Sequence, residues 1–568
     1  MTPPVSWGIV KSVMIVGTAD VLVCLFLGRI ARIFRWDKTF FWMHEPSADG
    51  KEAMYCQISS GGLFGLKSYT AQVEVDVSRG LPCFDMVGLL DSEVREARER
   101  IRVALHHIGM GLSAEKITVN LSPAGIPKTG TGFDLPAALG ILGAKEVIPP
   151  ERLKGIWAAG ELGLDARVKP VPGILAMVTE AAEAGSLECI LPMENLREGL
   201  LQERTAVMGV ETLEEAMLYA ASGAEERCLQ RKQARERLET LPRTEQEEEA
   251  VPDFSVIRGM EEAKTAAMTA AAGMHNLLLA GPPGTGKTML ARCMPGILPP
   301  MTRREQYEIS SIYSAAGRLE EGRLLERRPF VSPHHTVSPY ALTGGGSIPK
   351  PGMVTLAHRG VLFLDELAEF KRQTLDVLRQ PLEEGKIFLA RSRGHFVYPA
   401  DFMLLAATNP CPCGYYPDRN RCRCRDWEVS RYLSRISGPL LDRIDLCCTV
   451  SSLPLKRLWE EEQSGLGSAY MRERVLEARE RQRLRYAGTQ IKGNGRLGAG
   501  ELMNYCPLGL KEQEFLEKAA ERTGLSARGC HRVIRTARTL ADLDGSEEIL
   551  VRHLSQAVYY RSGHIFQK

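Results

Sequence analysis

The chain has 568 residues, of which 44% are hydrophobic and 25% charged, and its formal net charge is +2. This length exceeds one hydrophobic core and predicts two to four domains. The balanced charge excludes a protein that is basic as a whole, so any surface for a nucleic acid must be local. Four of the 14 cysteines cluster and the others are scattered without a pairing pattern, which favours a reducing, cytoplasmic compartment.

The first 53 residues differ from the rest of the chain. The stretch "SVMIVGTADVLVCLFLG" (12–28) is apolar but short, Asp20 interrupts it, and the basic "RIARIFRW" follows. A membrane span needs about 20 apolar residues. We interpret 1–53 as an extension from a start placed too early, with Met54 as the true start. A weak membrane segment and a structural extension remain alternatives, and we expect no stable membrane association.

Residues 54–221 have a mixed α/β pattern. The sequence "AQVEVDVS" (71–78) alternates with period two, and "KITVNLSP" (116–123) predicts a second strand. Between them, 91–109 places apolar residues on one helical face, with Asp91 or Ser92 as the cap.

Three further segments complete the predicted organisation. The charged stretch 222–250 predicts a linker or an exposed helix. A second domain is expected over 251–453, and a helical domain over 454–568.

A phosphate-binding loop is predicted at "GPPGTGKT", which fits G-x-x-x-x-G-K-[ST]. The apolar "NLLLA" precedes it and "MLARCM" follows, which is the strand-turn-helix context that the motif requires. The turn directs backbone N–H groups at phosphates, Lys287 reaches the β and γ phosphates, and Thr288 holds Mg²⁺. The candidate ATP-binding residues are Gly281, Pro282, Pro283, Gly284, Thr285, Gly286, Lys287 and Thr288.

Two later strands are expected to supply the other polar groups of the site. "GVLFLDELAEF" (360–370) ends its apolar run at Asp365, a candidate Mg²⁺ ligand, and Glu366, a candidate base for the attacking water. "DFMLLAATNP" (401–410) ends at Asn409, whose amide would orient that water. The alternatives are a solvated acidic turn and a turn-forming asparagine before proline.

Two arginines are candidates for phosphate contacts. Arg443 in "GPLLDRIDL" would reach the γ phosphate of a neighbouring subunit in a ring. Its alternative is a surface ion pair with Asp442 or Asp445. Arg528 begins a C-terminal helix and would act as a second phosphate sensor, or else lie on a solvated helix face.

These elements, in this order, resemble the AAA+ ATPases, and more narrowly the magnesium-chelatase-like ComM (YifB) family. The matching stretches are "GLPCFDMVGLLDSEVREARERIRVAL", "NLSPAGIPKTGTGFDLPAALGIL", "GELGLDARVKPVPGIL", "HNLLLAGPPGTGKTML", "GGGSIPKPGMVTLAHRGVLFLDELAEF", "NPCPCG" and "SGPLLDRIDL". The resemblance implies a Lon-protease-like (S5-type) α+β N-terminal domain, an AAA+ P-loop α/β core and a C-terminal α-helical lid domain. It also implies an ATP-driven homohexamer that binds single-stranded and branched DNA and promotes branch migration during natural transformation.

The N-terminal domain departs from an active Lon protease. A Lon-type site needs a nucleophilic serine and an activating lysine. In "PKTGTGFD", Gly132 stands in the place of the serine, and "ILAMVTEAAEAG" contains no lysine. Ser122 and Lys128 fit neither position. We therefore expect a non-proteolytic domain that serves as a scaffold or a nucleic-acid contact.

Two loop-rich segments are candidate DNA contacts inside the ring. The first, 329–352, is rich in Gly and Pro and carries His334 and His335. The second, 383–399, is predicted to be a hairpin with Arg391, Arg393 and His395 at its tip. Basic loops bind phosphates without reading sequence. The alternatives are ordinary solvated loops and, for the two histidines, metal ligands.

A cysteine cluster follows Asn409. The pattern C-x-C-x₈-C-x-C places Cys411, Cys413, Cys422 and Cys424 in one short, arginine-rich loop. Four thiolates suit a tetrahedral structural Zn²⁺, although the single-residue spacing is tighter than usual. Reduced, unligated thiols and a redox pair remain alternatives.

The leading hypothesis is an ATP-driven hexameric DNA motor with ATP bound between subunits. A magnesium-chelatase-like motor subunit and an AAA+ remodeller of protein substrates are the alternatives. A chelatase motor would not need the Lon-like domain.

Overall fold

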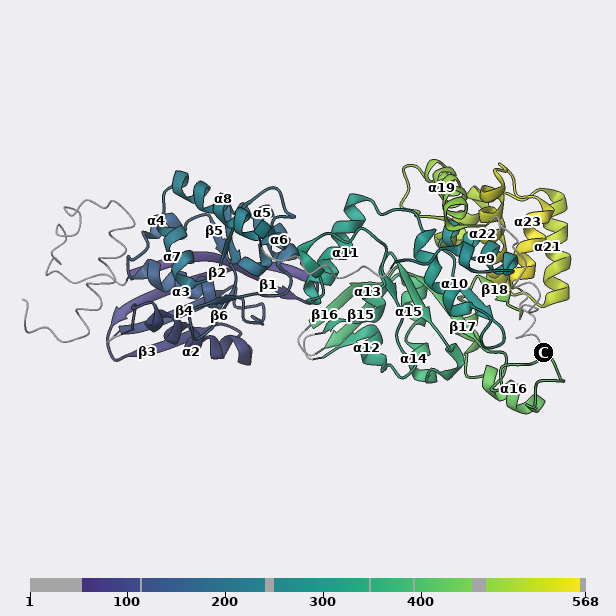
Figure 1. The fold of residues 1–568 in the computed structure, drawn as a ribbon, viewed down its shortest axis with the longest axis horizontal. Helices are drawn as coiled ribbons and strands as arrows, with labels where there is room; N and C mark the ends of the chain where they lie inside the picture. The colour runs from purple at the N-terminus through teal and green to yellow at the C-terminus, as the bar shows by residue number, and fades with distance from the viewer. Residues whose placement is uncertain are drawn as a thin grey trace, which may run out of the picture.

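The computed structural model describes residues 54–112, 115–240, 250–346, 349–391, 394–451 and 466–561. The ribbon is elongated: an N-terminal α/β region lies at one end, a second α/β region in the middle, and C-terminal helices at the other end (Figure 1). The prediction for 1–53 and the candidate Arg393 fall outside the described residues. No helix in the described ranges is both long and apolar enough to cross a membrane.

The N-terminal region is built on a seven-stranded sheet with strand order β3-β4-β2-β1-β5-β8-β9. Its strands are β1 (Met54–Phe64), β2 (Lys67–Arg79), β3 (Cys83–Val87), β4 (Glu115–Ser122), β5 (Ile156–Ala158), β8 (Glu188–Pro192) and β9 (Ala206–Val210). β2 runs antiparallel to β1 and β4, whereas β5, β8 and β9 run parallel to β1. The predicted strands at 71–78 and 116–123 are confirmed as parts of β2 and β4. Alternate residues of both are buried because only one face of each strand packs on the helices.

The helix predicted at 91–109 is confirmed as α2 (Ser92–His107). The Asp91 carboxylate caps it by accepting the Val94 N–H at 3.0 Å. Its buried face is Val94, Ala97, Ile101, Ala104 and Leu105. The other helices and short strands of this region are α3 (Asp134–Ala144), α4 (Pro150–Leu153), β6 (Glu161–Leu162), β7 (Val168–Lys169), α5 (Ile174–Glu183), α6 (Leu196–Gly199) and α7 (Leu213–Ala221).

The charged stretch predicted as a linker or an exposed helix forms α8 (Ala224–Thr240) over its described part. This helix packs on the N-terminal sheet and buries Ala234 and Leu238. Arg227 and Arg231 both pair with Glu188 of β8, at 2.8 and 2.5 Å. Two buried apolar side chains and these ion pairs therefore hold α8 against the sheet, although its composition alone suggests a solvated segment.

The middle region is a five-stranded parallel sheet in the order β11-β14-β17-β10-β18, which confirms the expected α/β P-loop core. Its strands are β10 (Leu277–Ala280), β11 (Phe330–Val331), β14 (Val361–Leu364), β17 (Met403–Thr408) and β18 (Leu446–Thr449). The three inner strands β14, β17 and β10 are buried along their whole length, as the continuous apolar runs predict.

Helices and hairpins surround this sheet. They are α9 (Glu261–Gly273), α10 (Lys287–Cys293), α11 (Arg303–Ala315), α12 (Pro339–Thr343), β12 (Gly344–Gly345), β13 (Lys350–Pro351), α13 (Met353–Leu356), α14 (Arg372–Asp376), α15 (Arg379–Glu384), β15 (Lys386–Arg391), β16 (Gly394–Pro399), α16 (Asp426–Leu433) and α17 (Gly438–Leu441). The hairpin predicted at 383–399 is confirmed by the antiparallel pairing of β15 with β16.

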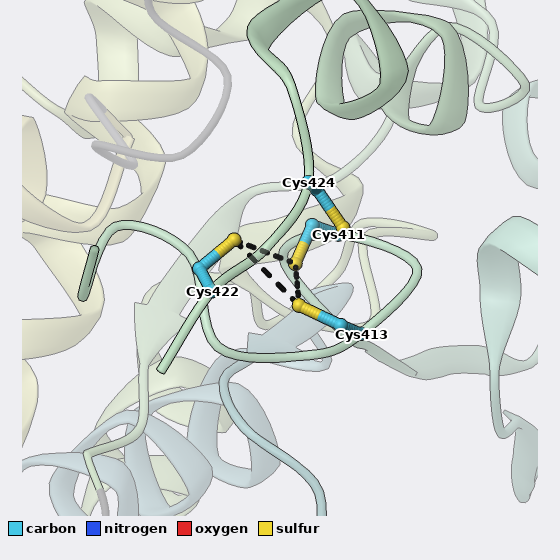
Figure 2. Close-up of side chains that lie close together, drawn as sticks. All are labelled: Cys411, Cys413, Cys422 and Cys424. Carbon is cyan, nitrogen blue, oxygen red and sulfur yellow. Dashed lines mark hydrogen bonds between the residues drawn. The ribbon is translucent and has the colours of Figure 1, made fainter. Parts of the chain in front are cut away.

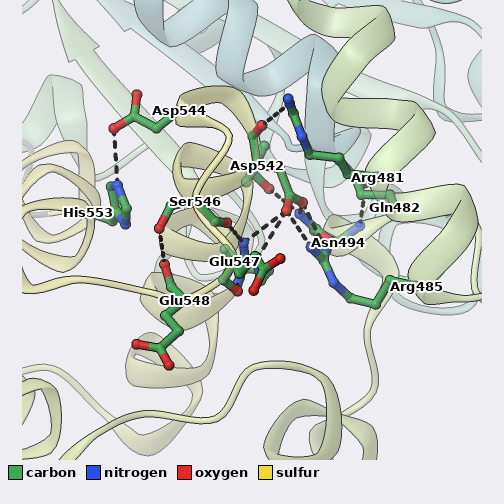
Figure 3. A network of polar contacts seen from close by, with 12 residues as sticks. Arg481, Gln482, Arg485, Asn494, Asp542, Asp544, Ser546, Glu547, Glu548 and His553 are labelled. Carbon is green, nitrogen blue, oxygen red and sulfur yellow. Dashed lines mark hydrogen bonds and ion pairs between the residues drawn. The ribbon is translucent and has the colours of Figure 1, made fainter.

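The C-terminal region is helical, as predicted. Its helices are α19 (Ser468–Arg485), α20 (Ala499–Tyr505), α21 (Leu510–Thr523), α22 (Ala527–Asp544) and α23 (Val551–Arg561). A buried carboxylate, Asp542 of α22, connects this helix to α19 and to the segment at Asn494: it pairs with Arg485 and Arg538 and accepts the Asn494 amide at 2.8 Å (Figure 3).

The N-terminal and middle regions meet at the end of α11. The Ser314 carbonyl accepts the Gly173 N–H at 3.0 Å, and the Ser314 hydroxyl donates to Glu198. Glu198 also accepts the Leu175 N–H at the start of α5, at 2.8 Å. The Tyr307 hydroxyl, also on α11, donates to the Leu201 carbonyl. The rings of Phe64 on β1 and Phe396 on the hairpin lie 4.6 Å apart between centroids and are tilted by 41°. Contacts on both α11 and the hairpin thus connect the regions.

Candidate ATP site and cysteine cluster

The phosphate loop has the predicted strand-turn-helix form. The buried strand β10 leads into Gly281, where an added Cβ would overlap the Val450 carbonyl, so glycine is required there. The turn ends at Gly286, whose φ of 89° is left-handed, immediately before α10. The Thr285 hydroxyl closes the turn on the Pro282 carbonyl at 2.9 Å.

The surroundings of Lys287 suit the binding of an anion. Its ammonium lies among acceptors, 2.8 Å from the Gly281 carbonyl, 2.7 Å from the Pro282 carbonyl and 3.3 Å from Oδ1 of Asn409. Burial lowers the pKa of this lysine, and the charge of Asp365 offsets the effect only in part. A phosphate at this place would compensate the cost of the buried charge.

The two candidate Mg²⁺ ligands lie side by side. The Thr288 hydroxyl donates to Oδ2 of Asp365 at 2.7 Å, and the other oxygen of Asp365 accepts the Glu366 N–H at 2.9 Å. A hydroxyl and a carboxylate held together by the ends of α10 and β14 are oxygen donors of the kind that Mg²⁺ prefers. These residues therefore fit a nucleotide with its Mg²⁺.

Asn409 and Glu366 lie at the same edge of the sheet, because β14 and β17 are parallel neighbours. Asn409 contacts Lys287 as described above. Glu366 begins the turn after β14, and its side chain is 55% exposed. The structure thus brings together the loop, Asp365, Glu366 and Asn409; their catalytic roles stay predictions.

Arg443 and Arg528 lie at the opposite end of the strands. Asn276 directly precedes β10, and its side-chain amide donates to the Arg443 carbonyl at 2.8 Å. Asn276 and Arg528 also line one cavity. Four strand residues lie between Asn276 and Gly281, which places these two residues roughly 16 Å apart. Both arginines therefore lie at the end of the sheet away from the phosphate loop of their own chain.

That cavity has a volume of about 350 Å³ and a strongly cationic wall. The basic residues lining it are Arg496, Arg528, His531, Arg532 and Arg535. Asp445 pairs with Arg532 at 2.6 Å. Burial would raise the pKa of Asp445, but His275 and Arg532 hold it well below its usual range. The guanidinium groups that line the cavity outnumber its acidic groups, so the cavity suits an anion.

The alternative prediction for Arg443, a surface ion pair with Asp442 or Asp445, was wrong. Arg443 pairs with Glu383, and its Nε donates to the Arg379 carbonyl at 3.0 Å. Asp442 lies 3.4 Å from Arg561 instead. The sequence did not indicate the pair with Glu383, because Glu383 is 60 positions away from Arg443 along the chain.

The four clustered cysteines converge (Figure 2), and their sulfurs all lie within 4.8 Å of one another. The separations are 3.4 Å for Cys411–Cys413, 3.6 Å for Cys413–Cys422 and 3.8 Å for Cys411–Cys422. These exceed the roughly 2.05 Å of a disulfide bond, and the cysteines are free thiols.

Backbone N–H groups point at the sulfur of Cys411. They are those of Gly414 and Tyr416, at 3.2 and 3.4 Å. Partial burial raises the pKa of the Cys413 thiol, but N–H groups of Tyr415 and Arg423 outweigh it and lower the pKa to about 6. The donor set therefore fits a tetrahedral zinc ion.

The two candidate DNA-contact segments have different surroundings. His334 is exposed and bonded to the Thr336 hydroxyl at 2.9 Å, while His335 lies beside Glu366. Within the described ranges, one group of three or more potential metal ligands is found, and it is the cysteine cluster. The two histidines do not belong to it. His395 is exposed on β16, and Arg391 ends β15.

Sequence reasoning missed three features of the site. Glu383, Arg532 and the contact between His335 and Glu366 carry no motif. The density of arginines in "ARGCHRVIRTAR" is the one available signal for the cationic cavity, and a helical wheel places Arg528, Arg532 and Arg535 on one face.

Three family profiles match the chain in order. They are described as "Subunit ChlI of Mg-chelatase" over residues 73–195, "Magnesium chelatase, subunit ChlI" over 253–458 and "Magnesium chelatase, subunit ChlI C-terminal" over 465–561. Together they cover the N-terminal, middle and C-terminal regions.

Two full-length relatives are similar to the chain. The YifB protein of Salmonella typhimurium is 41% identical over 498 residues, which are 88% of this chain and 95% of that protein. Competence protein ComM of Haemophilus influenzae is 40% identical over 505 residues, 89% of this chain and 97% of that protein. Lon protease 2 of Bacillus subtilis is 30% identical over 198 residues, 30% of this chain and 35% of that protein, which supports the Lon-like domain. On these matches the chain belongs to the ComM (YifB) family of magnesium-chelatase-like AAA+ proteins.

Proposed function

We propose that the protein is an ATP-driven DNA motor of the ComM type, which forms a homohexameric ring and drives branch migration in transformation and recombination. Membership of the family supports an AAA+ ATPase that uses ATP and Mg²⁺. The hexamer, the DNA substrate and branch migration are the proposal. The name of the Haemophilus influenzae relative, competence protein, supports the link to transformation.

One observation carries the proposal. The phosphate loop, Asp365, Glu366 and Asn409 gather at one end of the parallel sheet, whereas Arg443 and the cationic cavity with Arg528 lie at the other. An arginine that neutralises charge on the γ phosphate must touch it. These arginines fit that role only if one subunit's arginine end faces the next subunit's phosphate loop. Repeating this head-to-tail contact closes a ring.

Each residue then has a defined task. Bound ATP and Mg²⁺ supply the phosphoryl group and the neutralising charge of the reaction. Lys287 binds phosphate oxygens, and Thr288 and Asp365 hold the cation. Glu366 takes the proton of the attacking water that Asn409 orients. Arg443 and Arg528 act from the neighbouring subunit on the charge that develops at the γ phosphate.

DNA is proposed to contact the inserted loop and the hairpin. The hairpin presents Lys386 and His395 on its exposed face, and Arg391 lies at its tip. His334 and His335 belong to the loop between β11 and α12. Such basic side chains on protruding segments bind a phosphate backbone irrespective of sequence, as a motor that moves along DNA requires.

The cysteine cluster is proposed to hold a structural Zn²⁺. Four thiolates leave no open position, so the ion would stabilise the loop and take no part in catalysis. The loop packs on the phosphate loop, because a Cβ at Gly414 would lie 2.5 Å from Cδ of Pro283. A metal at this place would therefore fix one wall of the ATP site.

A magnesium-chelatase motor subunit is the second candidate, and the descriptions of the three profiles favour it. The match to ComM, which covers 89% of a chain that includes the Lon-like domain, favours the DNA motor. Stimulation of ATP hydrolysis by single-stranded or branched DNA separates the two candidates, because a DNA motor responds to DNA and a chelatase motor subunit does not need it.

The test is branch migration on a synthetic four-way junction, with wild type compared with Lys287→Ala and Glu366→Gln. The first variant loses the cation that binds the phosphates, and the second keeps the shape of the side chain without its basicity. Both are expected to bind the junction in a gel-shift assay and to fail to move it. Rates are expected to fall by about 100-fold or more, as for loss of a general base.

A matched control is Glu480→Gln, which removes an exposed carboxylate on α19 far from the site. This variant should move the junction at the wild-type rate. Equal junction movement by wild type and both site variants would refute the motor.

A further inference from the structure

The two arginines assigned to the neighbour's phosphate stand on different elements. Arg443 lies in the turn between α17 and β18, and Arg528 lies in the first turn of α22. Both must reach the same γ phosphate, so the spacing between a turn of the middle region and a helix of the C-terminal region has to be fixed. Misplacing such a group by about 1 Å can cost about 100-fold in rate. A contact that joins these two elements therefore bears on the reaction.

Asp445 is a buried carboxylate at the junction of these elements. It follows Arg443 by two positions, and its side chain is 4% exposed. Oδ1 of Asp445 accepts a hydrogen bond from Arg532 at 2.6 Å, and Oδ2 accepts the Asn276 N–H at 3.0 Å. Nδ1 of His275 lies 3.5 Å from Oδ2. The carboxylate is thus held between α22 and the residues that lead into β10.

One side of this junction leads to Arg443. The Asn276 carbonyl accepts the N–H groups of Asp445 and Leu446, both at 3.0 Å, and the Asn276 amide donates to the Arg443 carbonyl at 2.8 Å. Oδ1 of Asn276 accepts the Leu404 N–H of β17 at 2.9 Å. The backbone that carries the Arg443 side chain is therefore connected to two strands of the sheet through Asn276 and Asp445.

The other side of the junction leads to Arg528. Arg532 is four positions, about one helical turn, after Arg528, so the two side chains share one face of α22. Among the residues that the structure describes, the ion pair of Arg532 with Asp445 is the polar contact between the first two turns of α22 and the middle region. The next one, between His275 and Thr539, comes two turns later. The pair with Asp445 therefore limits how far the start of α22, and Arg528 with it, can shift.

The two acidic residues that line the cationic cavity differ in burial. Glu383 pairs with Arg443 itself, and its side chain is 58% exposed. An incoming phosphate can replace such an exposed partner, because exposed ion pairs contribute little. Asp445 is buried behind Arg532, and its charge has no substitute there. Glu383 can therefore release its arginine to a phosphate, whereas the contact of Asp445 persists.

We propose that Asp445 is a positioning residue that sets the spacing between Arg443 and Arg528 and so prepares both for the γ phosphate of the neighbouring subunit. This inference rests on the proposed function, because it takes both arginines to act in the next subunit's site. Asp445 contacts Asn276, which is roughly 16 Å from Gly281, so it does not touch the nucleotide of its own subunit. Loss of Asp445 impairs the site of the next subunit and leaves its own phosphate loop intact.

The test is Asp445→Asn, which keeps the size of the side chain and an acceptor for the Asn276 N–H but removes the charge that holds Arg532. We expect kcat for ATP hydrolysis to fall about 10- to 100-fold, the cost of displaced arginines. The KM for ATP should change by less than about twofold, because the phosphate loop of the variant is intact.

Mixing with Lys287→Ala separates positioning from a general loss of structure. Lys287→Ala has intact arginines and Asp445→Asn has an intact phosphate loop, so about a quarter of the contacts in an equal mixture are fully intact. The mixture should hydrolyse ATP at about a quarter of the wild-type rate, well above the mean of the two variants alone. A variant that is damaged as a whole would keep a poor phosphate loop and show no gain.

Two further variants complete the test. Arg532→Gln removes the other partner of the ion pair and should show the same loss and the same gain on mixing, and the double variant should be no slower than either single one. Asp442→Asn is the matched control, because it changes a 60% exposed carboxylate beside Arg443 that pairs with Arg561. This control should hydrolyse ATP at the wild-type rate.

A wild-type rate in Asp445→Asn, or no gain on mixing in an Asp445→Asn protein that melts like wild type, would overturn this inference while leaving the motor intact. If Asp445→Asn melts early, the same two results with Arg532→Gln decide. Absence of recovery when Lys287→Ala is mixed with Arg443→Ala would instead overturn the proposed ring and, with it, the role of Asp445.

Discussion

A buried carboxylate in the C-terminal region, that of Asp542, is fully paired. The Asp542 side chain is fully buried and meets Arg485 at 2.9 Å, Arg538 at 3.0 Å and Asn494 at 2.8 Å (Figure 3). Because α19, α22 and the segment at Asn494 all contribute to it, the network fixes how these elements sit on one another. An unpaired charge at its centre would be costly, since desolvation of an ion is not compensated elsewhere.

We therefore expect Asp542→Ala to lower the free energy of unfolding of the C-terminal helices by about 3–5 kcal/mol. The change leaves the guanidinium groups of Arg485 and Arg538 buried without their carboxylate. Urea denaturation followed by circular dichroism measures the effect.

The matched control for this prediction is Arg483→Gln, which removes an exposed ion pair with Glu480 on α19. Exposed ion pairs contribute little to stability, so this variant should unfold nearly as wild type does. Equal losses in the two variants would contradict a special role for the buried network.

At the scale of elements, the cysteine loop connects a strand of the sheet to helix α16. Asn409 lies two positions before Cys411, and Gly414 packs on Pro283 of the phosphate loop. The loop also carries Arg421, whose guanidinium lies 4.3 Å from the centre of the Tyr415 ring. Its apolar packing is small, because Cys411, Cys422 and Val429 form the buried centre of this cluster. A loop with so little core needs another source of order, and the proposed zinc ion would supply it.

We expect the purified protein to carry about one zinc ion per chain, as four thiolates in one tetrahedral set imply. A variant with Cys411→Ser and Cys413→Ser should lose the metal and hydrolyse ATP more slowly, because the loop no longer supports Pro283. Metal analysis and the ATPase rate are the two measurements.

Cys228→Ser is the matched control, because Cys228 is an exposed thiol on α8 outside the cluster. It should keep its zinc. The same metal content in all three proteins would rule out the cysteine site.

The proposed ATP site is divided between the two ends of the central sheet, with the phosphate loop at one end and Arg443 and Arg528 at the other. The N-terminal region contacts the middle region through Ser314 and Tyr307 of α11 and through Phe396 of the hairpin. Burial of Glu198 at that junction raises its pKa, and hydrogen bonds from Ser314, Leu175 and Asn195 offset the effect only in part. These buried polar contacts therefore join α11 to the N-terminal region.

ATP sites that lie between the subunits of a ring predict that two inactive variants restore each other's activity when they are mixed. Lys287→Ala and Arg443→Ala should each be inactive alone, because the first lacks the lysine and the second the neighbour's arginine. In an equal mixture, about a quarter of the contacts join an intact phosphate loop to an intact arginine, since each subunit uses opposite surfaces to its two neighbours. ATP hydrolysis should therefore recover on mixing.

The measurement is the ATPase rate after the two variants are unfolded and refolded together, or coexpressed with different tags. A mixture of Lys287→Ala with Lys287→Ala, Arg443→Ala is the control, because it contains no intact phosphate loop. Absence of recovery in the first mixture would place Arg443 within its own subunit's site and contradict the ring.

The sequence by itself determined the features that depend on neighbours along the chain. The phosphate loop, the acidic end of β14, the capped helix α2, the hairpin and the cysteine loop all follow from spacing, because each is formed by a short run of residues. The apolar runs of β10, β14 and β17 likewise predicted the buried strands of a parallel sheet. Composition misled for α8, whose two buried side chains are outnumbered by its charges.

Only the tertiary structure decided which distant residues meet. Thr288 and Asp365 are 77 positions apart, and Lys287 and Asn409 are 122 apart. Motif knowledge anticipates these two pairs, but nothing local indicates that Arg443 pairs with Glu383 or that His335 reaches Glu366. Strand order explains the difference: the parallel sheet sends every strand's carboxyl end to one edge, so it fixes which side chains share a site and which belong to opposite surfaces.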